Sequence, residues 1–219
     1  MSFIVVTAAT AKALTTVPRV RAELSLSDVS PPEPVVNRWI EQASARAASY
    51  CRRQFGRQTV RERFPFGRAS IGVPCDEGII LTAEPIVRIV AVTVDGTVAA
   101  PETFEIEGNR LYCLDGDGRR IPWSCAPLAV DYEVGWLLPI ESRGNPPTTT
   151  AADLPADIEG AVIKLVGVAV SSWGRDVMVK SEDVAGVGSS SWYVQGGGAS
   201  LPHPEAESAL TPYRRRLFA

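Results

Sequence analysis

Residues 154–176 read LPADIEGAVIKLVGVAVSSWGRD, and this stretch decides how the rest of the chain must fold. Pro155 suits the first position of a helix, and Asp157 and Glu159 place acids in the first turn, where the helix dipole favours them. The apolar positions form two neighbouring rows at helical spacing: Ile158, Val162, Leu165, Ala169 and Trp173, with Ile163, Val166 and Val170 beside them. The charged residues of this stretch and a length short of about 20 apolar residues argue against a membrane span. We therefore expect a helix covered on most of its circumference, inside a bundle or between subunits.

Overall charge excludes a globally basic nucleic-acid-binding protein, because the 219 residues carry a net charge of -3. Local charge is uneven. Eight arginines stand against two acids in one block: Arg38, Arg46, Arg52, Arg53, Arg57, Arg61, Arg63 and Arg68. Seven acids stand against Arg88 in the next: Asp76, Glu77, Glu84, Asp95, Glu102, Glu105 and Glu107. Blocks of opposite sign can pair within the chain or be solvated, and they can also join copies of it.

Cysteines 51, 75, 113 and 125 lack the spacing of a zinc or redox motif, so we expect reduced thiols packed as small apolar groups. The first ten residues, MSFIVVTAAT, lack the basic segment of a signal peptide and read as an arm or a strand. These features predict a protein made and used in a cytoplasm.

Two further helices are expected before the centre of the chain. Thr16 can cap a short helix over 17–24, and the prolines of 30–34 precede an amphipathic helix over 34–55 that stops at Gly56. The period then changes to two, which predicts strands over 58–66, 78–82, 86–95, 102–107, 110–114 and 127–135. Asp95-Gly96 and Gly108-Asn109 are typical of tight hairpin turns.

The pattern predicts an α+β fold: a small helical bundle with an inserted antiparallel β unit and an extended C-terminal segment. The domains expected are an N-terminal arm over 1–15, a helical core from 16–56 and 153–176, a β unit over 57–137, a loop over 177–204 and a final segment over 205–219. Trp192 and Tyr193 lie within the loop, and aromatic residues in a loop often become ordered against a partner.

The sequence offers little that could perform catalysis. His203, the single histidine, lies between two prolines and reads as a solvated loop residue. Residues 115–118, DGDG, lack the later ligands of a calcium loop and predict a turn. The glycines of 186–198 fit no phosphate-binding motif. We expect no enzyme, no cofactor and no metal site.

The chain end PYRRRLFA is the one motif that suggests binding. Arg214, Arg215 and Arg216 can simply be a solubilising cluster that complements a helix dipole. Alternatively, Tyr213, Leu217 and Phe218 anchor in a partner while the arginines meet carboxylates or phosphates. Apolar residues at a free chain end are costly to leave in water, which favours the second interpretation.

The order of these pieces resembles the head-tail connector family of long-tailed phages and gene transfer agents, also called adaptor or head-completion proteins. The resemblance runs from Val17 to Phe218. The segments that carry it are NRWIEQASARAASYCRRQFGR (37–57), EPIVRIVAVTVDG (84–96), AVDYEVGW (129–136), the central 154–176 stretch, VKSEDVAGVGSSSWYV (179–194) and LTPYRRR (210–216).

The resemblance implies a ring, usually of twelve copies, under the portal of a virion and assembled in the host cytoplasm. The ring would bind the portal protein on one side and a tail-side stopper or tail-completion protein on the other, while DNA passes through its lumen without being read in sequence. Residues 213–218 would then be the portal-docking end. Trp192, Tyr193, Arg52, Arg53 and Arg57 would lie at contacts between subunits or with the tail. The alternative, drawn from the residues alone, is a standalone nucleic-acid-binding or regulatory module that uses the basic segment Arg38–Arg68.

Overall fold

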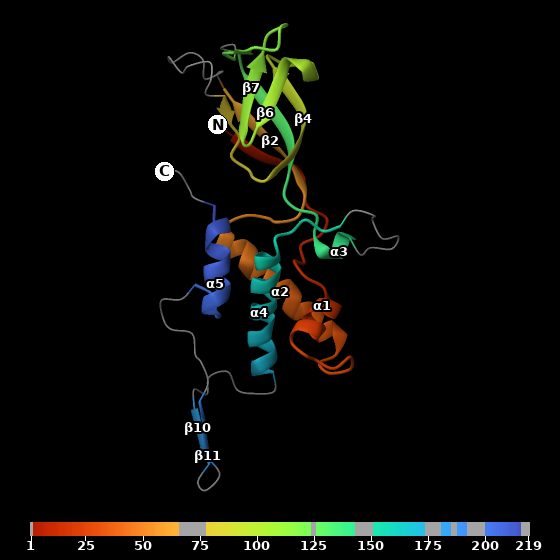
Figure 1. Ribbon diagram of the computed structural model, residues 1–219, viewed down its shortest axis with the longest axis vertical. Coiled ribbons are helices and arrows are strands. Elements are labelled where there is room, and N and C mark those ends of the chain that lie inside the picture. The colour runs from red at the N-terminus through yellow and green to blue at the C-terminus, as the bar shows by residue number, and fades with distance from the viewer. Residues whose placement is uncertain are drawn as a thin grey trace. The chain divides into compact units, whose positions relative to one another are not determined.

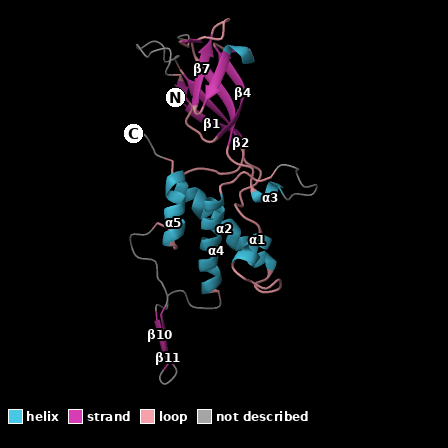
Figure 2. Ribbon diagram, viewed as in Figure 1, coloured by secondary structure: helices cyan, strands magenta, loops and turns pink. Residues whose placement is uncertain are grey.

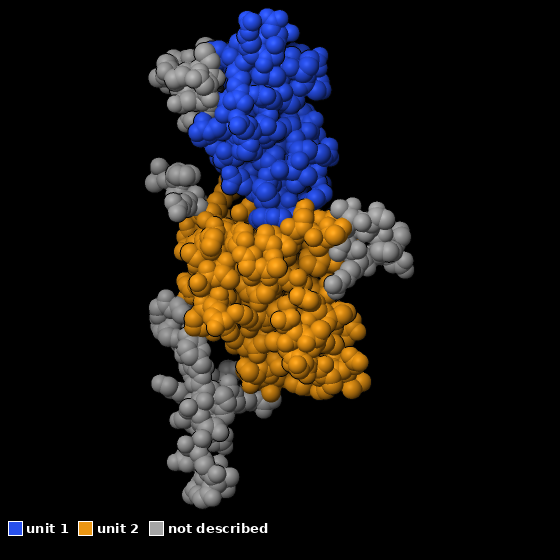
Figure 3. All heavy atoms as spheres, in the orientation of Figure 1, with its two compact units in different colours: residues 1–10, 56–136 blue, residues 11–55, 137–219 orange. Residues whose placement is uncertain are grey.

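The computed structural model describes residues 2–65, 78–123, 126–142, 151–173, 181–184, 188–191 and 200–215. Predicted loop residues Trp192 and Tyr193 lie outside these ranges, as do Arg216, Leu217 and Phe218 of the predicted docking end. The chain forms two compact units, one of residues 1–10 and 56–136 and the other of residues 11–55 and 137–219 (Figures 1 and 3). We call the first the β unit and the second the helical unit. The fold is mixed α+β, as the sequence predicts.

A five-stranded antiparallel sheet forms the larger part of the β unit (Figure 2). Its strands, in spatial order, are β1 (Ser2–Thr7), β2 (Gln58–Phe64), β9 (Leu128–Val134), β4 (Ile86–Val94) and β5 (Thr97–Val98). Along β9 the side chains alternate strictly between buried and half-buried positions. This is the period of two that the sequence shows, and it turns Leu128, Val130, Tyr132 and Val134 inward.

The second sheet of the β unit is smaller, and the hairpin of residues 104–114 forms its centre. It consists of β3 (Ile79–Ile80), β6 (Phe104–Glu107), β7 (Arg110–Leu114) and β8 (Arg120–Ile121), with a short 3-10 helix, η3 (Pro101–Thr103), before β6. Both predicted hairpin turns are present, since Asp95 and Gly96 have φ of 49° and 78° and Gly108 has φ of 61°. The predicted turn at residues 115–118 is confirmed too, because the Asp115 carboxylate accepts hydrogen bonds from the backbone N–H groups of Asp117 and Arg119.

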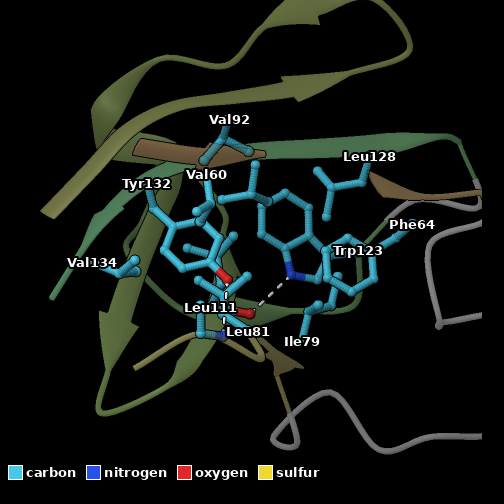
Figure 4. Packing of buried hydrophobic residues seen from close by; sticks show 12 residues of the cluster. Val60, Phe64, Ile79, Leu81, Val92, Leu111, Trp123, Leu128, Tyr132 and Val134 are labelled. Atoms are coloured by element: carbon cyan, nitrogen blue, oxygen red, sulfur yellow. Dashed lines mark hydrogen bonds between the residues drawn. The ribbon is translucent and has the colours of Figure 1, made fainter. Parts of the chain in front are cut away.

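Side chains of both sheets share one apolar core (Figure 4). Val60, Val92 and Val130 come from the larger sheet and Leu111 from the smaller one, and all four are fully buried. The Trp123 indole N–H donates to the Leu111 carbonyl at 3.2 Å, as Figure 4 shows. Interdigitation of two sheet faces therefore holds the β unit together.

One buried carboxylate, that of Glu62, lies in the β unit among these apolar side chains. Glu62 on β2 is fully buried and accepts hydrogen bonds from the Tyr132 hydroxyl at 2.8 Å, from the Thr82 backbone N–H at 3.0 Å and from the Thr82 hydroxyl. The Tyr132 hydroxyl in turn accepts from the Ala83 N–H at 3.2 Å. A buried carboxylate is tolerated only when it is hydrogen-bonded. The network thus pins the segment after β3 to the larger sheet.

The helical unit contains α1 (Val17–Glu23), α2 (Glu33–Cys51), α3 (Pro139–Ser142), α4 (Ala156–Ser172), α5 (Pro204–Leu210) and the 3-10 turn η4 (Thr211–Tyr213). The helix predicted at 154–176 is α4. Its first half is buried as expected, through Ile158, Ala161, Val162, Ile163, Leu165 and Val166, whereas Gly167 to Val170 are only half-buried. Trp173 follows the helix with an exposed fraction of 50% and packs edge-on against Trp39 at 6.0 Å between ring centroids. The expectation of a helix covered along its whole length is therefore met only in part.

The structure decides one local expectation and corrects two others. Of the arm or strand expected at the N-terminus, residues 2–7 form strand β1, which is paired with β2. Its run of four apolar residues has no period, and its partner lies more than fifty positions away, so pattern alone could not show the pairing. The loop expected over 177–204 contains β10 (Ser181–Val184) paired with β11 (Gly188–Ser191), two strands so polar that no apolar alternation marks them. Helix α2 ends before Arg52, which takes a left-handed φ of 54°, and not at Gly56.

Candidate docking surface at the C-terminal segment

Before the predicted docking end, the C-terminal segment packs against other parts of the helical unit. Leu201, Ala206 and Leu210 are buried, and α5 packs on α4. Lys164 of α4 forms an ion pair with Glu205, which lowers the pKa of that carboxyl group. His203, expected as a solvated loop residue, caps α5 instead: its Nδ1 accepts from the Ala206 N–H at 3.4 Å. The segment is thereby held as far as the start of η4.

Hydrogen bonds then tie the following residues to the ends of α2 and α4. The Tyr213 hydroxyl donates to the Asp157 carboxylate, with oxygen distances of 2.7 and 2.9 Å. The Tyr50 and Thr211 hydroxyl oxygens lie 2.9 Å apart. The Arg215 backbone N–H donates to the Cys51 carbonyl at 2.9 Å. We call these three contacts the latch; it fixes the chain up to Arg215.

Two residues of the latch, Tyr213 and Cys51, have side chains with raised pKa values. Partial burial, the hydrogen bond to Asp157 and the charge of that carboxylate together raise the pKa of Tyr213 to about 12. Burial raises the pKa of the Cys51 thiol to about 11, although Arg53 and Arg214 act in the opposite direction. At neutral pH the phenol is therefore a donor and the thiol is neutral and unreactive.

Four arginines surround the point where the segment leaves the latch. Arg52 and Arg53 follow the C-terminal end of α2, where the helix dipole favours cations. Arg53 donates to the Tyr213 carbonyl at 3.5 Å, and the Arg214 guanidinium lies 5.3 Å from the centroid of the Tyr50 ring. With Arg215 they form what we call the arginine cluster. Arg52 and Arg214 are exposed to solvent, so the cluster presents positive charge outward.

The structure brings only some of the sequence-predicted site residues together. Arg52 and Arg53, expected at subunit or tail contacts, lie beside Tyr213, Arg214 and Arg215, which are expected at the portal. Tyr213, expected to anchor in a partner, uses its hydroxyl inside the chain. Arg57 belongs to the β unit, so the arginines predicted as one group are divided between two units.

The basic block at 38–68 is likewise divided. Arg38 and Arg46 lie exposed on α2. Arg61 lies on β2 and forms a bidentate ion pair with Asp131 of β9, with nitrogen–oxygen distances of 2.5 and 2.6 Å. That pair raises the pKa of the guanidinium. Arg88 and Arg120 also find carboxylates within the β unit, on Glu133 and on Glu105 and Glu107. Much of the charge of the β strands is therefore used within the two sheets, between neighbouring strands or, for Arg120, across β7.

Sequence reasoning missed Asp157 and Tyr50 as parts of the surface. Asp157 stands out as a first-turn acid, but nothing in the sequence connects it with a tyrosine 56 positions later. Within the described ranges, no group of three or more histidine, cysteine or acidic side chains could hold a metal ion. Those ranges also contain no helix with the length and apolar character needed to cross a bilayer.

No protein-family model matches the chain, and no curated protein matches it. Its fold, however, is similar to that of chains in solved particles. One comes from the neck of an empty GTA particle computed with C6 symmetry; the TM-score is 0.53 at 14% identity, covering 100% of this chain and 98% of that one. A chain from the neck of a native GTA particle, computed with C12 symmetry, gives the same values. A chain from the virion of a native gene transfer agent (GTA) particle gives 0.54 at 15% identity, covering 100% and 97%. The likeness shows the fold.

Proposed function

We propose that the chain is a structural component of the neck of a phage or gene transfer agent particle, where the DNA-filled head joins the tail. The observation that carries this proposal is the likeness to chains of such particles over 100% of this chain and 97% or more of theirs. A likeness over the full length of both chains involves the β unit and the helical unit together. It therefore supports a common architecture more strongly than a match to one widespread module would.

Within the neck we propose the role of adaptor, a ring of copies that attaches to the portal. The C6 and C12 symmetries of the similar necks support a ring of twelve copies. In the sequence, Arg216, Leu217 and Phe218 follow directly after Arg215, the last residue of the latch. Two apolar residues, Leu217 and Phe218, that follow arginines held by the latch suit a portal groove with an acidic rim. Repeated around a ring, such weak contacts add up to firm attachment.

The remaining partners follow from the same role. A tail-side stopper or tail-completion protein would bind the opposite side of the ring, with Trp192 and Tyr193 at a subunit or tail contact. DNA in the lumen would meet only backbone-directed charge, without sequence preference. The chain would carry no catalytic centre and no cofactor.

Deleting residues 216–219 tests the portal contact. Because the latch ends at Arg215, the truncated chain should keep its thermal stability, yet electron micrographs should show DNA-filled heads without tails. Leu217→Ser combined with Phe218→Ser should act alike. Ile121→Ser, at an exposed strand position of the β unit, is the matched control and should leave tails attached. Normal tailed particles made with the truncated chain would contradict the portal contact.

The rival hypothesis predicts a different result. A nucleic-acid-binding module should lose DNA affinity when Arg52, Arg53 and Arg57 are replaced by alanine, and its log-log salt slope should fall by about one for each phosphate that is no longer neutralised. An adaptor should bind DNA weakly before and after the change. A strong, salt-dependent and arginine-dependent affinity would favour the module.

A further inference from the structure

The larger sheet of the β unit ends in a strand that is apolar on both of its faces. β1 is the last strand in the order β1-β2-β9-β4-β5. Its Phe3, Ile4, Val5 and Val6 have exposed fractions of 39, 45, 45 and 52%. Successive side chains of a strand point to opposite faces, so apolar surface is exposed above and below β1. Edge strands are ordinarily protected by charges, by proline or by a cover, and β1 has neither a charge nor a proline.

The opposite end of the same sheet has a matching edge. β5 pairs with β4 only at Thr93 and Val94, which leaves residues 86–91 of β4 hydrogen-bonded to β9 alone among the described strands. Two bulges interrupt the β4–β9 register, at Val87 and Val90, and these two side chains are exposed by 39 and 46%. The charge on this edge, Arg88, is satisfied by Glu133 at 2.7 Å. Apart from Arg88, the side chains of residues 86–91 are apolar, and this edge is similar in length to β1.

Strand direction makes the two edges complementary. β1 runs antiparallel to β2, β2 to β9 and β9 to β4, so β1 and β4 run in opposite directions. If a second copy continues the sheet by simple rotation, its β4 edge arrives antiparallel to β1 of the first copy. Such a head-to-tail contact uses one edge of each kind per copy and closes into a ring with none left over.

We propose that β1 of one copy adds to the residue 86–91 edge of β4 in the next copy, so that neighbouring β units share a continuous antiparallel sheet. The occupant of the β1 edge is therefore a second copy of this chain. The ring itself rests on the proposed function, but the pairing of the two edges rests on the sheet alone. Main-chain hydrogen bonds would provide the affinity, and the apolar side chains of both edges would be buried between copies.

Photo-cross-linking of the purified full-length chain tests this pairing. Ile4 is replaced by p-benzoylphenylalanine, and isotopically light and heavy chains are mixed so that only cross-links between copies are counted. The expected cross-link joins position 4 to the peptide containing residues 86–94 of another copy. The same photo-reactive residue at Ile106 on β6, exposed by 39% in the smaller sheet, should not reach that peptide.

Two other outcomes would overturn the proposal. A cross-link from position 4 to residues 2–7 of another copy would mean a twofold β1–β1 dimer, and no cross-link between copies at any soluble concentration would mean that neither edge is used. Val6→Lys and Val90→Lys should each weaken self-association about tenfold or more while the chain stays folded, because both positions are exposed. Ile106→Lys should leave self-association unchanged. If these cross-linking and self-association tests fail while the chain is still found at a particle neck, only the strand pairing is refuted and the proposed function is not.

Discussion

The latch offers the sharpest test of how the C-terminal segment is held. We expect Tyr213→Phe to destabilise the helical unit by about 0.5–1 kcal/mol, because it removes one hydrogen bond to a carboxylate that remains in contact with water. Asp157→Ala should cost about 1–1.5 kcal/mol, since it removes the acceptor of that hydrogen bond and also a first-turn acid from α4. If the two groups interact as the structure has them, the double variant should cost about 0.5–1 kcal/mol less than the sum of the two single changes.

Urea unfolding of the four proteins of this cycle measures the coupling, and amide hydrogen exchange at Arg215 reports whether the segment has detached. Glu33→Ala is the matched control, because Glu33 is an exposed acid in the first turn of α2, at the far end of the helix that Arg215 contacts. Its effect should simply add to that of Tyr213→Phe. A coupling energy of zero for Tyr213 and Asp157, or an Arg215 amide that exchanges as fast as in an unfolded peptide, would refute the latch.

Three further predictions concern stability. The pKa of Tyr213 is raised to about 12 in the folded chain and is about 10 in the unfolded chain, so its contribution to the free energy of unfolding is complete below pH 10 and is lost as pH rises to about 12. The free energy of unfolding, measured at several pH values in this range, should fall by up to about 1 kcal/mol, and Tyr213→Phe should not show this loss. Glu62→Ala should destabilise the β unit by roughly 2–4 kcal/mol because it leaves buried donors without an acceptor, whereas Glu62→Gln, which keeps an acceptor, should cost less in the same urea assay. Leu165→Ala should cost about 2–5 kcal/mol by opening a cavity under α4, while Val29→Ala, at a side chain exposed by 83%, should stay within about 0.5 kcal/mol in thermal unfolding.

The β unit shows how far the sequence predicts the fold. Strands β2, β4, β6, β7 and β9 follow from the sequence within a few residues. β2, β6 and β9 largely alternate apolar and polar residues, whereas β4 and β7 are short, mainly apolar runs that turn residues bound. β5 and β8 have two residues each, too few to show a period. The pattern leaves β1 open between an arm and a strand, because a run of apolar residues without alternation fits both, and only its pairing with β2 decides between them.

The candidate docking surface is predictable only as a set of residues. Tyr213 and the arginines after it stand out in sequence as an unusual chain end. What the sequence could not show is that the Tyr213 hydroxyl is satisfied by Asp157, or that Arg53 lies against the Tyr213 carbonyl. Both contacts join segments separated by more than fifty residues, and such pairings follow from packing rather than from local pattern.

The central claim is that this chain builds the joint between head and tail, and locating it in intact particles tests that claim most directly. Electron cryomicroscopy of particles from cells that produce this protein, with a small tag added after Gly96 in the exposed β4–β5 turn, should reveal ring-shaped extra density at the neck, between the portal and the tail. Tag density elsewhere in the particle, or purified tailed particles that contain no copy of the chain, would contradict it.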